Sequence, residues 1–172
     1  EKVDEEDWAT AWKKYYYPTK VGGRLVVCPS WETYAPKPGE VVLTMDPGMA
    51  FGTGTHETTS LCIRLMEDYL VPGEKVLDVG CGSGILSIAG ALLGASEVLG
   101  VEIDPDAVAI AGENIALNHV ERIASAQYGD LTKGIDFQAD VIVANLMADL
   151  VVTLSKDVAR HLLPGGRYPP GG

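Results

Sequence analysis

The chain has 172 residues, of which 47% are hydrophobic and 22% are charged, and its net charge is −11. This is the composition of a globular protein with room for one domain and a small appendage, and no apolar run has membrane-spanning length, so we expect no membrane association. The acidic balance repels phosphate backbones, which argues against direct nucleic-acid binding and favours a basic protein as partner.

The three cysteines, Cys28, Cys62 and Cys81, are odd in number and include no CxxC pair. This spacing indicates neither a zinc site nor a disulfide framework, so we expect no bound metal. Unpaired cysteines are typical of a reducing compartment, and we therefore expect a cytoplasmic protein.

The first part of the chain, residues 1–45, has the signals of a linker region. Residues 4–14 begin with acids and end with lysines, which favours a helix. Residues 15–31 read as two short strands around Gly22-Gly23, a β-hairpin signal, and residues 40–45 read as a further strand.

From about residue 56, helical and strand patterns alternate. A helix is expected over residues 58–70, where Leu61, Leu65, Met66 and Tyr69 recur at helical spacing. The remaining patterns predict strands over 75–80, 97–103, 125–130 and 140–146, and helices over 85–93, 105–120 and 148–163. This alternation predicts an α/β fold with a doubly wound, mostly parallel sheet.

The C-terminal end of the pattern is irregular. The last helix is expected to stop at Pro164-Gly165-Gly166, and the order of elements implies another strand near Arg167. Prolines in this stretch do not support a central strand, so we expect an incomplete sheet and a C-terminal truncation.

A glycine-rich loop follows the strand over 75–80. Gly80, Gly82 and Gly84 allow a sharp turn and a close approach of a ligand to the backbone, and Glu102 follows 22 residues after Gly80. An acid at that place accepts both hydroxyls of a ribose, so the pair predicts a nucleoside-type cofactor. The alternative is a tight strand–helix turn with a solvated Glu102.

The form of the loop distinguishes between cofactors. It reads D-x-G-x-G-x-G, with Asp78 inside the strand, and not the GxGxxG of dinucleotide-binding proteins. It resembles the S-adenosylmethionine (SAM) loop of class I methyltransferases, in which the acid and the glycine backbone face the amino-acid part of SAM. Asp130 resembles the adenine-contacting position, and its alternative role is to close a turn.

Two further stretches are candidates for the same site. Asn145 sits where this fold carries its acceptor-binding motif, and its side chain with the next carbonyl could hold an amine; its alternative role is structural. The stretch DPGMAFGTGTHETT, residues 46–59, could cover the cofactor, with Phe51 shielding it and Thr59 near its carboxylate. His56 could be a base, a gate or a loop hydrogen-bonder, and we favour the last.

Taken together, these stretches resemble the bacterial ribosomal protein L-eleven methyltransferase (PrmA) family. The matching runs cover most of residues 7–152, and DPGMAFGTGTH joined to VLDVGCGSGIL is the most specific. The resemblance implies a Rossmann-like enzyme that uses SAM to methylate lysine side chains and the N-terminal amine of a ribosomal protein of the large subunit. The family's cofactor positions fall on Thr59, Gly80, Glu102 and Asn145, and many relatives have Asp in place of Glu102.

The resemblance also implies a division of the chain. We expect a linker helix and small hairpin in residues 1–45 and a SAM-binding domain in residues 46–172. Family members carry a substrate-recognition domain before the linker. Two other functions are weighed: methylation of another protein lysine or a small amine, and SAM binding without catalysis.

Overall fold

The computed structural model describes residues 17–45, 56–144 and 161–167. Its main sheet has five parallel strands in the order β6-β5-β4-β7-β8. These strands are β4 (Lys75–Val79), β5 (Glu97–Glu102), β6 (Ala124–Tyr128), β7 (Ala139–Ala144) and β8 (Leu162–Arg167). The order is that of a Rossmann-like sheet, in which the chain starts at the centre, moves to one edge and then returns to fill the other side. The predicted α/β fold is confirmed.

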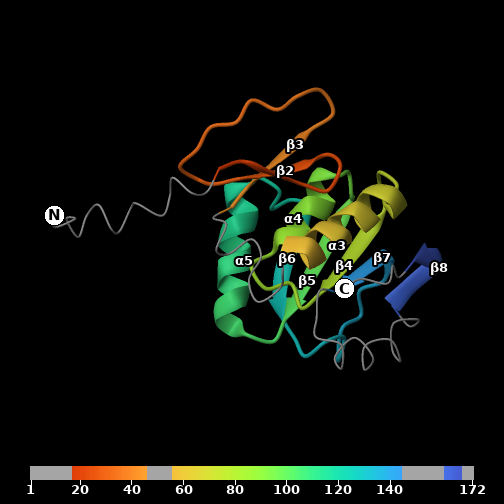
Figure 1. Ribbon diagram of the computed structural model, residues 1–172. Coiled ribbons are helices and arrows are strands. Elements are labelled where there is room, and N and C mark those ends of the chain that lie inside the picture. Colours follow the sequence, from red (N-terminus) through yellow and green to blue (C-terminus); the bar gives the residue numbers. More distant parts are fainter. Residues whose placement is uncertain (1–16, 46–55, 145–160, 168–172) are drawn as a thin grey trace.

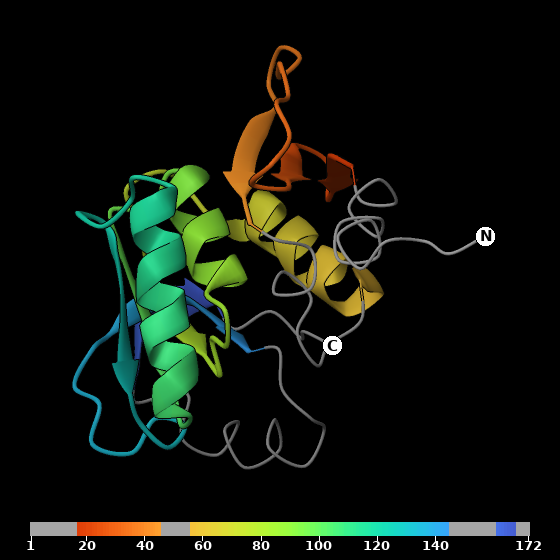
Figure 2. The ribbon, with the colours of Figure 1, turned by 90° about the vertical axis from the view of Figure 1, so that its left-hand side faces the viewer.

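Three described helices cover one face of this sheet: α3 (His56–Tyr69), α4 (Ile85–Leu92) and α5 (Pro105–Leu117) (Figures 1 and 2). Side chains alternate between the faces of a strand, so Val76 packs under the helices whereas Leu77 packs on the opposite face. Ile135 and Phe137, from the connection between β6 and β7, pack on that opposite face. The central strands are apolar on both faces, as a covered parallel sheet requires.

The helix predicted over 58–70 begins two residues earlier than expected, and its buried face differs from the expected one. Leu61 and Tyr69 are 45% and 44% exposed, whereas Cys62, Ile63 and Met66 are buried. The reason is that α3 packs against both the main sheet and the small N-terminal sheet, which rotates the buried stripe by about one residue.

A second, small sheet lies above the helix layer (Figure 1). It contains β1 (Thr19–Val21), β2 (Leu25–Cys28) and β3 (Val41–Thr44), and β1 and β2 form the predicted antiparallel hairpin around Gly22-Gly23. β3 pairs with β2 in parallel. Val21, Leu25 and Leu43 join the same hydrophobic core as α3 and α4, so the small sheet packs directly on the helices.

The C-terminal expectation was wrong in one respect. Leu162 and Leu163 belong to strand β8 and not to a helix, and the strand continues through Pro164. β8 is the edge strand of the sheet, where a proline is tolerated because one side needs no partner. The pairing shifts register between Ala139 and Val141, which accommodates the Pro-Gly-Gly residues as an irregularity.

The helix predicted over 4–14, and the part of the helix predicted over 148–163 that precedes residue 161, lie outside the described residues. The division of the chain at residue 46 stays a prediction.

Candidate functional site

The candidate site lies where the direction of the chain through the sheet reverses. β4 is central, with β5 on one side and β7 on the other, so the connections that leave β4 and β7 run in opposite directions. In open α/β sheets, ligands bind in the crevice outside the carboxyl ends of such strands. The glycine loop after β4, Glu102 at the end of β5 and Asp130 after β6 all come to this edge because their strands are parallel.

The glycine loop, residues 80–84, turns back against the end of β5. The amides of Gly80 and Cys81 both donate to the carbonyl of Val101, at 2.8 and 3.0 Å. Gly82 has φ +52°, and a Cβ added there would meet no atom within 4 Å. The loop therefore presents bare backbone to open space at this point, as a loop that admits a ligand does.

Glu102 is held in place by main-chain amides. Its Oε1 accepts from the amide of Gly82 at 3.0 Å, and its Oε2 accepts from the amide of Asp104 at 2.9 Å. Each carboxylate oxygen has a second lone pair, so the group can still accept from two further donors. The structure thus brings the predicted acid and the predicted loop into direct contact.

Helix α4 starts directly after the loop. Its N-cap residue is Gly84, with φ +90°, which has no side chain to cap the helix. The first-turn amides of such a helix lack intrahelical partners, and the helix dipole adds a positive potential there. This end of α4 is suited to a ligand carboxylate.

Asp78 lies beneath the loop and is 1% exposed. The hydroxyl of Ser87 donates to its Oδ2 at 2.7 Å, and the backbone amide of Ser87 also donates to it. Burial raises the pKa of Asp78 to about 7; the two bonds from Ser87 oppose this rise, and the nearby charge of Glu102 adds to it. Asp78 therefore joins β4 to the first turn of α4, and its role as a cofactor ligand stays a prediction.

Side chains at the ends of β5 and β6 complete this edge. Asp130 is exposed and forms an ion pair with Lys133 at 3.2 Å. Ile103, which directly follows Glu102, is 56% exposed, and Tyr128 at the end of β6 is 62% exposed. Ile103 and Tyr128 thus place exposed apolar surface beside Glu102, which pairs in register with Tyr128.

The other predicted site residues have different places. Thr59 is fully buried in α3. His56 is the first residue of that helix. Phe51 and Asn145 lie outside the described residues, so their assignments stay predictions.

Three polar residues that shape the site were not predicted from the sequence: Ser87, Asn114 and Asn118. Asn114 donates from Nδ2 to the carbonyl of Ser83 in the glycine loop, at 2.9 Å. Ser87 and Asn114 are buried polar residues inside helices, and such residues need partners. A polar residue on the buried face of a predicted helix indicates that a hydrogen-bond partner is needed. It does not indicate which group that partner is.

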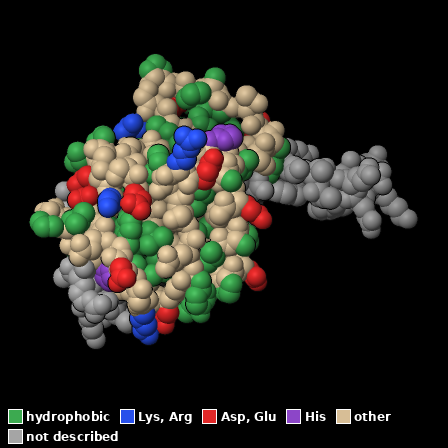
Figure 3. Space-filling view, turned by 180° about the vertical axis from the view of Figure 1, so that it is seen from behind, with side chains coloured by type: hydrophobic (Ala, Val, Ile, Leu, Met, Phe, Trp, Pro, Cys, Tyr) green, Lys and Arg blue, Asp and Glu red, His purple; other side chains and the backbone are tan. Residues whose placement is uncertain are grey.

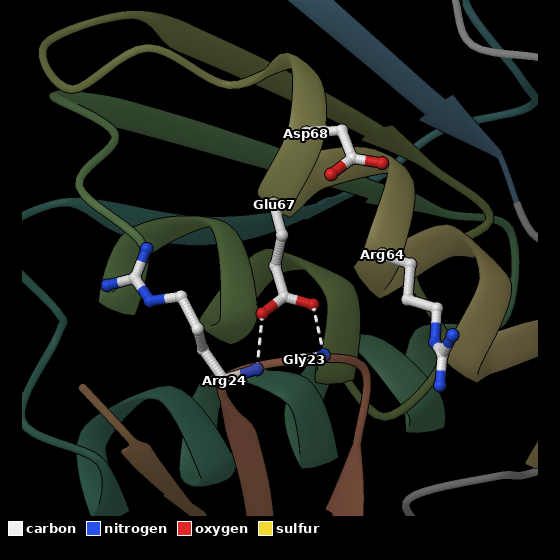
Figure 4. A pocket seen from close by; sticks show the side chains of 5 residues that line it. All are labelled: Gly23, Arg24, Arg64, Glu67 and Asp68. Carbon is white, nitrogen blue, oxygen red and sulfur yellow. Dashed lines mark hydrogen bonds between the residues drawn. The ribbon is translucent and has the colours of Figure 1, made fainter. Parts of the chain in front are cut away.

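A separate cavity of about 430 Å³ lies between the hairpin turn and α3, lined by Gly23, Arg24, Arg64, Glu67 and Asp68 (Figure 4). The carboxylate of Glu67 accepts from the amides of Gly23 and Arg24, so it fills the anion-binding position of the turn itself. This contact joins α3 to the small sheet, and we assign it a structural role.

Among the described residues, no group of three or more His, Cys, Asp or Glu side chains is arranged to hold a metal ion. Within the same part of the chain, every helix is too short or too polar to cross a bilayer. Acidic and basic side chains are interspersed on the face seen in Figure 3.

Comparisons with known proteins point to one family. Residues 1–172 match the model of the family described as ribosomal protein L11 methyltransferase (PrmA). A ribosomal protein L11 methyltransferase of Caldanaerobacter subterraneus is 56% identical over 171 residues, which cover 99% of this chain and 55% of that protein. One from Heliobacterium modesticaldum is 54% identical over 164 residues, which cover 95% of this chain and 52% of that protein. The chain thus spans about half the length of these curated relatives.

Solved structures agree with this result. A ribosomal protein L11 methylase from Lactobacillus delbrueckii has a TM-score of 0.81 and 35% identity, and the match covers 90% of this chain and 78% of that chain. An RNA methyltransferase from Salinibacter ruber, solved in complex with S-adenosyl-L-homocysteine, has a TM-score of 0.57 and 28% identity, covering 63% of this chain and 71% of that chain.

Proposed function

The chain belongs to the ribosomal protein L11 methyltransferase (PrmA) family, and from this premise we propose that it is part of a SAM-dependent N-methyltransferase. The proposed acceptors are amino groups of a ribosomal protein: lysine side chains and the N-terminal amine. The observation that carries the proposal is the contact between Glu102 and the amide of Gly82 at the reversal point of the sheet. This contact supports the proposal because it brings a carboxylate, which can accept from ribose hydroxyls, next to an open glycine backbone.

The residues at this edge fit the parts of SAM. Glu102 would accept from the two ribose hydroxyls through its remaining lone pairs. The start of α4, whose N-cap residue Gly84 has no side chain, would receive the carboxylate of the amino-acid part. Ile103 would contact the adenine. SAM supplies a methyl group on a positively charged sulfur, which a nucleophile can attack.

The acceptor amine must be uncharged, because its nitrogen needs a free lone pair to attack the methyl group. A lysine amine has a reference pKa of about 10.4 and an α-amine one of about 8, so both need help near neutral pH. Removal of water from the crevice lowers the pKa of a lysine amine. We propose that Asn145 and the carbonyl after it accept from the N–H groups of the amine and so aim its lone pair. Alignment of this kind contributes roughly 7 to 11 kcal/mol to a two-reactant step.

The proposed partner and compartment rest on charge and on thiol state. The chain has a net charge of −11, which favours approach of a basic protein. The three cysteines of the sequence are all free and buried in the structure, in keeping with a reducing compartment, and we propose the cytoplasm.

The first test is calorimetric titration of the chain with S-adenosylhomocysteine, with NAD as the comparison ligand. We expect binding of the first ligand only. Glu102→Ala removes two acceptors for charge-assisted hydrogen bonds, so we expect the dissociation constant to rise more than about tenfold. Glu97→Ala, at the other end of β5, is the matched control and is expected to bind as the original chain does.

The outcomes separate the candidate functions. Tighter binding of NAD, or unchanged binding by Glu102→Ala, contradicts the proposed cofactor. Binding without methyl transfer to the large-subunit ribosomal protein, measured by product mass with the full-length protein, leaves a cofactor-binding protein or a methyltransferase with another acceptor. Free lysine and other basic proteins as acceptors distinguish these two.

A further inference from the structure

Helix α5 contacts the glycine loop through Asn114 and Ala111. Asn114 is 8% exposed and donates from Nδ2 to the carbonyl of Ser83 at 2.9 Å. One turn earlier, Ala111 packs under the loop: a Cβ added at Gly84 would lie 3.3 Å from the Cβ of Ala111. The same face of α5 therefore holds the loop by packing at one residue and by a hydrogen bond at the next.

The peptide group between Ser83 and Gly84 is fixed at both of its polar atoms. Its carbonyl accepts from Asn114, and its amide donates to the carbonyl of Cys81 at 2.8 Å. The preceding part of the loop is fixed by Glu102, which accepts from the amide of Gly82. Asn114 and Glu102 thus hold neighbouring residues of the loop, and both belong to the unit formed by β5 and α5.

One turn further along α5, Asn118 binds the small sheet. Its Oδ1 accepts from the amide of Thr44 at 2.8 Å, and its Nδ2 donates to the carbonyl of Thr44 at 2.9 Å. This pair of bonds imitates strand pairing at the end of β3. The Nδ2 of Asn118 also donates to the carbonyl of Asn114 at 2.9 Å, so both of its hydrogens are used.

We infer that Asn114 and Asn118 are positioning residues of the cofactor site. Together they form a polar connection, here called the asparagine bridge, that runs from Thr44 in the small sheet through α5 to Ser83 in the glycine loop. The bridge holds the loop backbone at the place from which it binds the cofactor. This inference rests on the proposed function, because it assigns the bridge a role in SAM binding.

Asn114→Asp tests the bridge with almost no change in side-chain volume. It replaces the Nδ2 donor by an acceptor that faces the carbonyl of Ser83, so the bond is lost. We expect the dissociation constant for S-adenosylhomocysteine to rise about tenfold, as the loss of one hydrogen bond to a buried group predicts. With the full-length enzyme, the KM for SAM should rise and the KM for the protein acceptor should stay constant.

Two further variants make the result specific. Asn118→Asp keeps the acceptor for the amide of Thr44 but loses both donations, and we expect a smaller loss of affinity in the same direction. Ile115→Val is the matched control, because Ile115 is buried in the same helix and its side chain carries no polar atom. It lowers stability without touching the loop, so its affinity should equal that of the original chain at a temperature where both are folded.

Hydrogen exchange of the ligand-free chain gives a second readout. The amides of residues 82–84 should exchange faster in Asn114→Asp and in Asn118→Asp, but not in Ile115→Val. If the original chain does not bind S-adenosylhomocysteine, the proposed function fails, and the exchange rates still decide whether the bridge holds the loop. If the original chain binds and Asn114→Asp binds equally tightly with unchanged exchange, the inference is overturned.

Discussion

Asp78→Asn should change how the stability of the chain depends on pH. The carboxylate of Asp78 is 1% exposed, and burial raises its pKa from 3.8 to about 7 in the folded chain. In the unfolded chain the group returns to its ordinary value near 3.8. Asparagine has nearly the same shape and cannot ionise, so it removes this dependence and keeps an oxygen for the Ser87 bonds.

The sign follows from proton binding. Between about pH 4 and pH 7, the folded chain holds the Asp78 proton and the unfolded chain has released it. The folded state binds more protons in this window, so the contribution of Asp78 to stability falls as the pH rises through it. The difference of about 3 between the two pKa values corresponds to about 4 kcal/mol in the free energy of unfolding. This loss of stability is complete above about pH 7.

Urea unfolding of both chains at several pH values measures this effect. The stability of Asp78→Asn minus that of the original chain should increase by up to about 4 kcal/mol between about pH 4 and pH 8. Any destabilisation caused by the amide hydrogens of the new asparagine is the same at every pH, so it does not affect the change with pH. Asp136→Asn, which removes an exposed carboxylate, is the control. A difference that stays flat with pH for Asp78→Asn would refute the reasoning.

Two further substitutions test the packing of β5 against α4 and the contact of α3 with the hairpin turn. In Gly100→Ala, the new Cβ would lie 2.8 Å from the Oγ of Ser87, so we expect a loss of about 1–3 kcal/mol in urea unfolding; an unchanged midpoint would contradict the close packing of β5 against α4. Glu67→Ala removes the acceptor for two amides of the hairpin turn, that of Gly23 among them, so we expect a loss of about 1–2 kcal/mol and faster exchange of these amides. Asp68→Ala, the exposed neighbour on α3, should leave both unchanged.

The architecture of the main sheet was predictable because its strands and helices have strong local signals. The strand before the glycine loop is a short apolar run, and Pro105 marks the start of α5, where Asp104 caps the helix as its side chain accepts from the amide of Asp106. These signals act within a few residues, so a single sequence displays them.

The bounds of strand β8 were not predictable in the same way, although the order of elements implies a strand near Arg167. Pro164 and the two glycines after it are local signals against a strand, and the helical pattern before them extends into Leu163. What makes a strand of this segment is its place at the edge of the sheet next to β7, which is a tertiary property. For β8, pairing with the neighbouring strand outweighs the local preference of its residues for other structures.

The candidate site shows the same division. Glu102 and the glycine loop were predicted because their spacing is a property of one βαβ unit. Asn114 and Asn118 were missed because their partners, Ser83 and Thr44, are 31 and 74 residues away in the sequence. The spacing of an asparagine on a helix does not tell which backbone group it will meet.

The place of β4 between β5 and β7 has a consequence for how the crevice is assembled. β4 can pair with β5 as soon as the intervening helix forms, but its other side waits for β7, where Val76 meets Val141. Long-range pairs of this kind form late because the loop between them must first close. We therefore expect β4 to pair with β5, which ends at Glu102, before β7 joins the sheet. A ligand that contacts residues on both sides of β4 would stabilise only the chain in which β5 and β7 have both paired with β4.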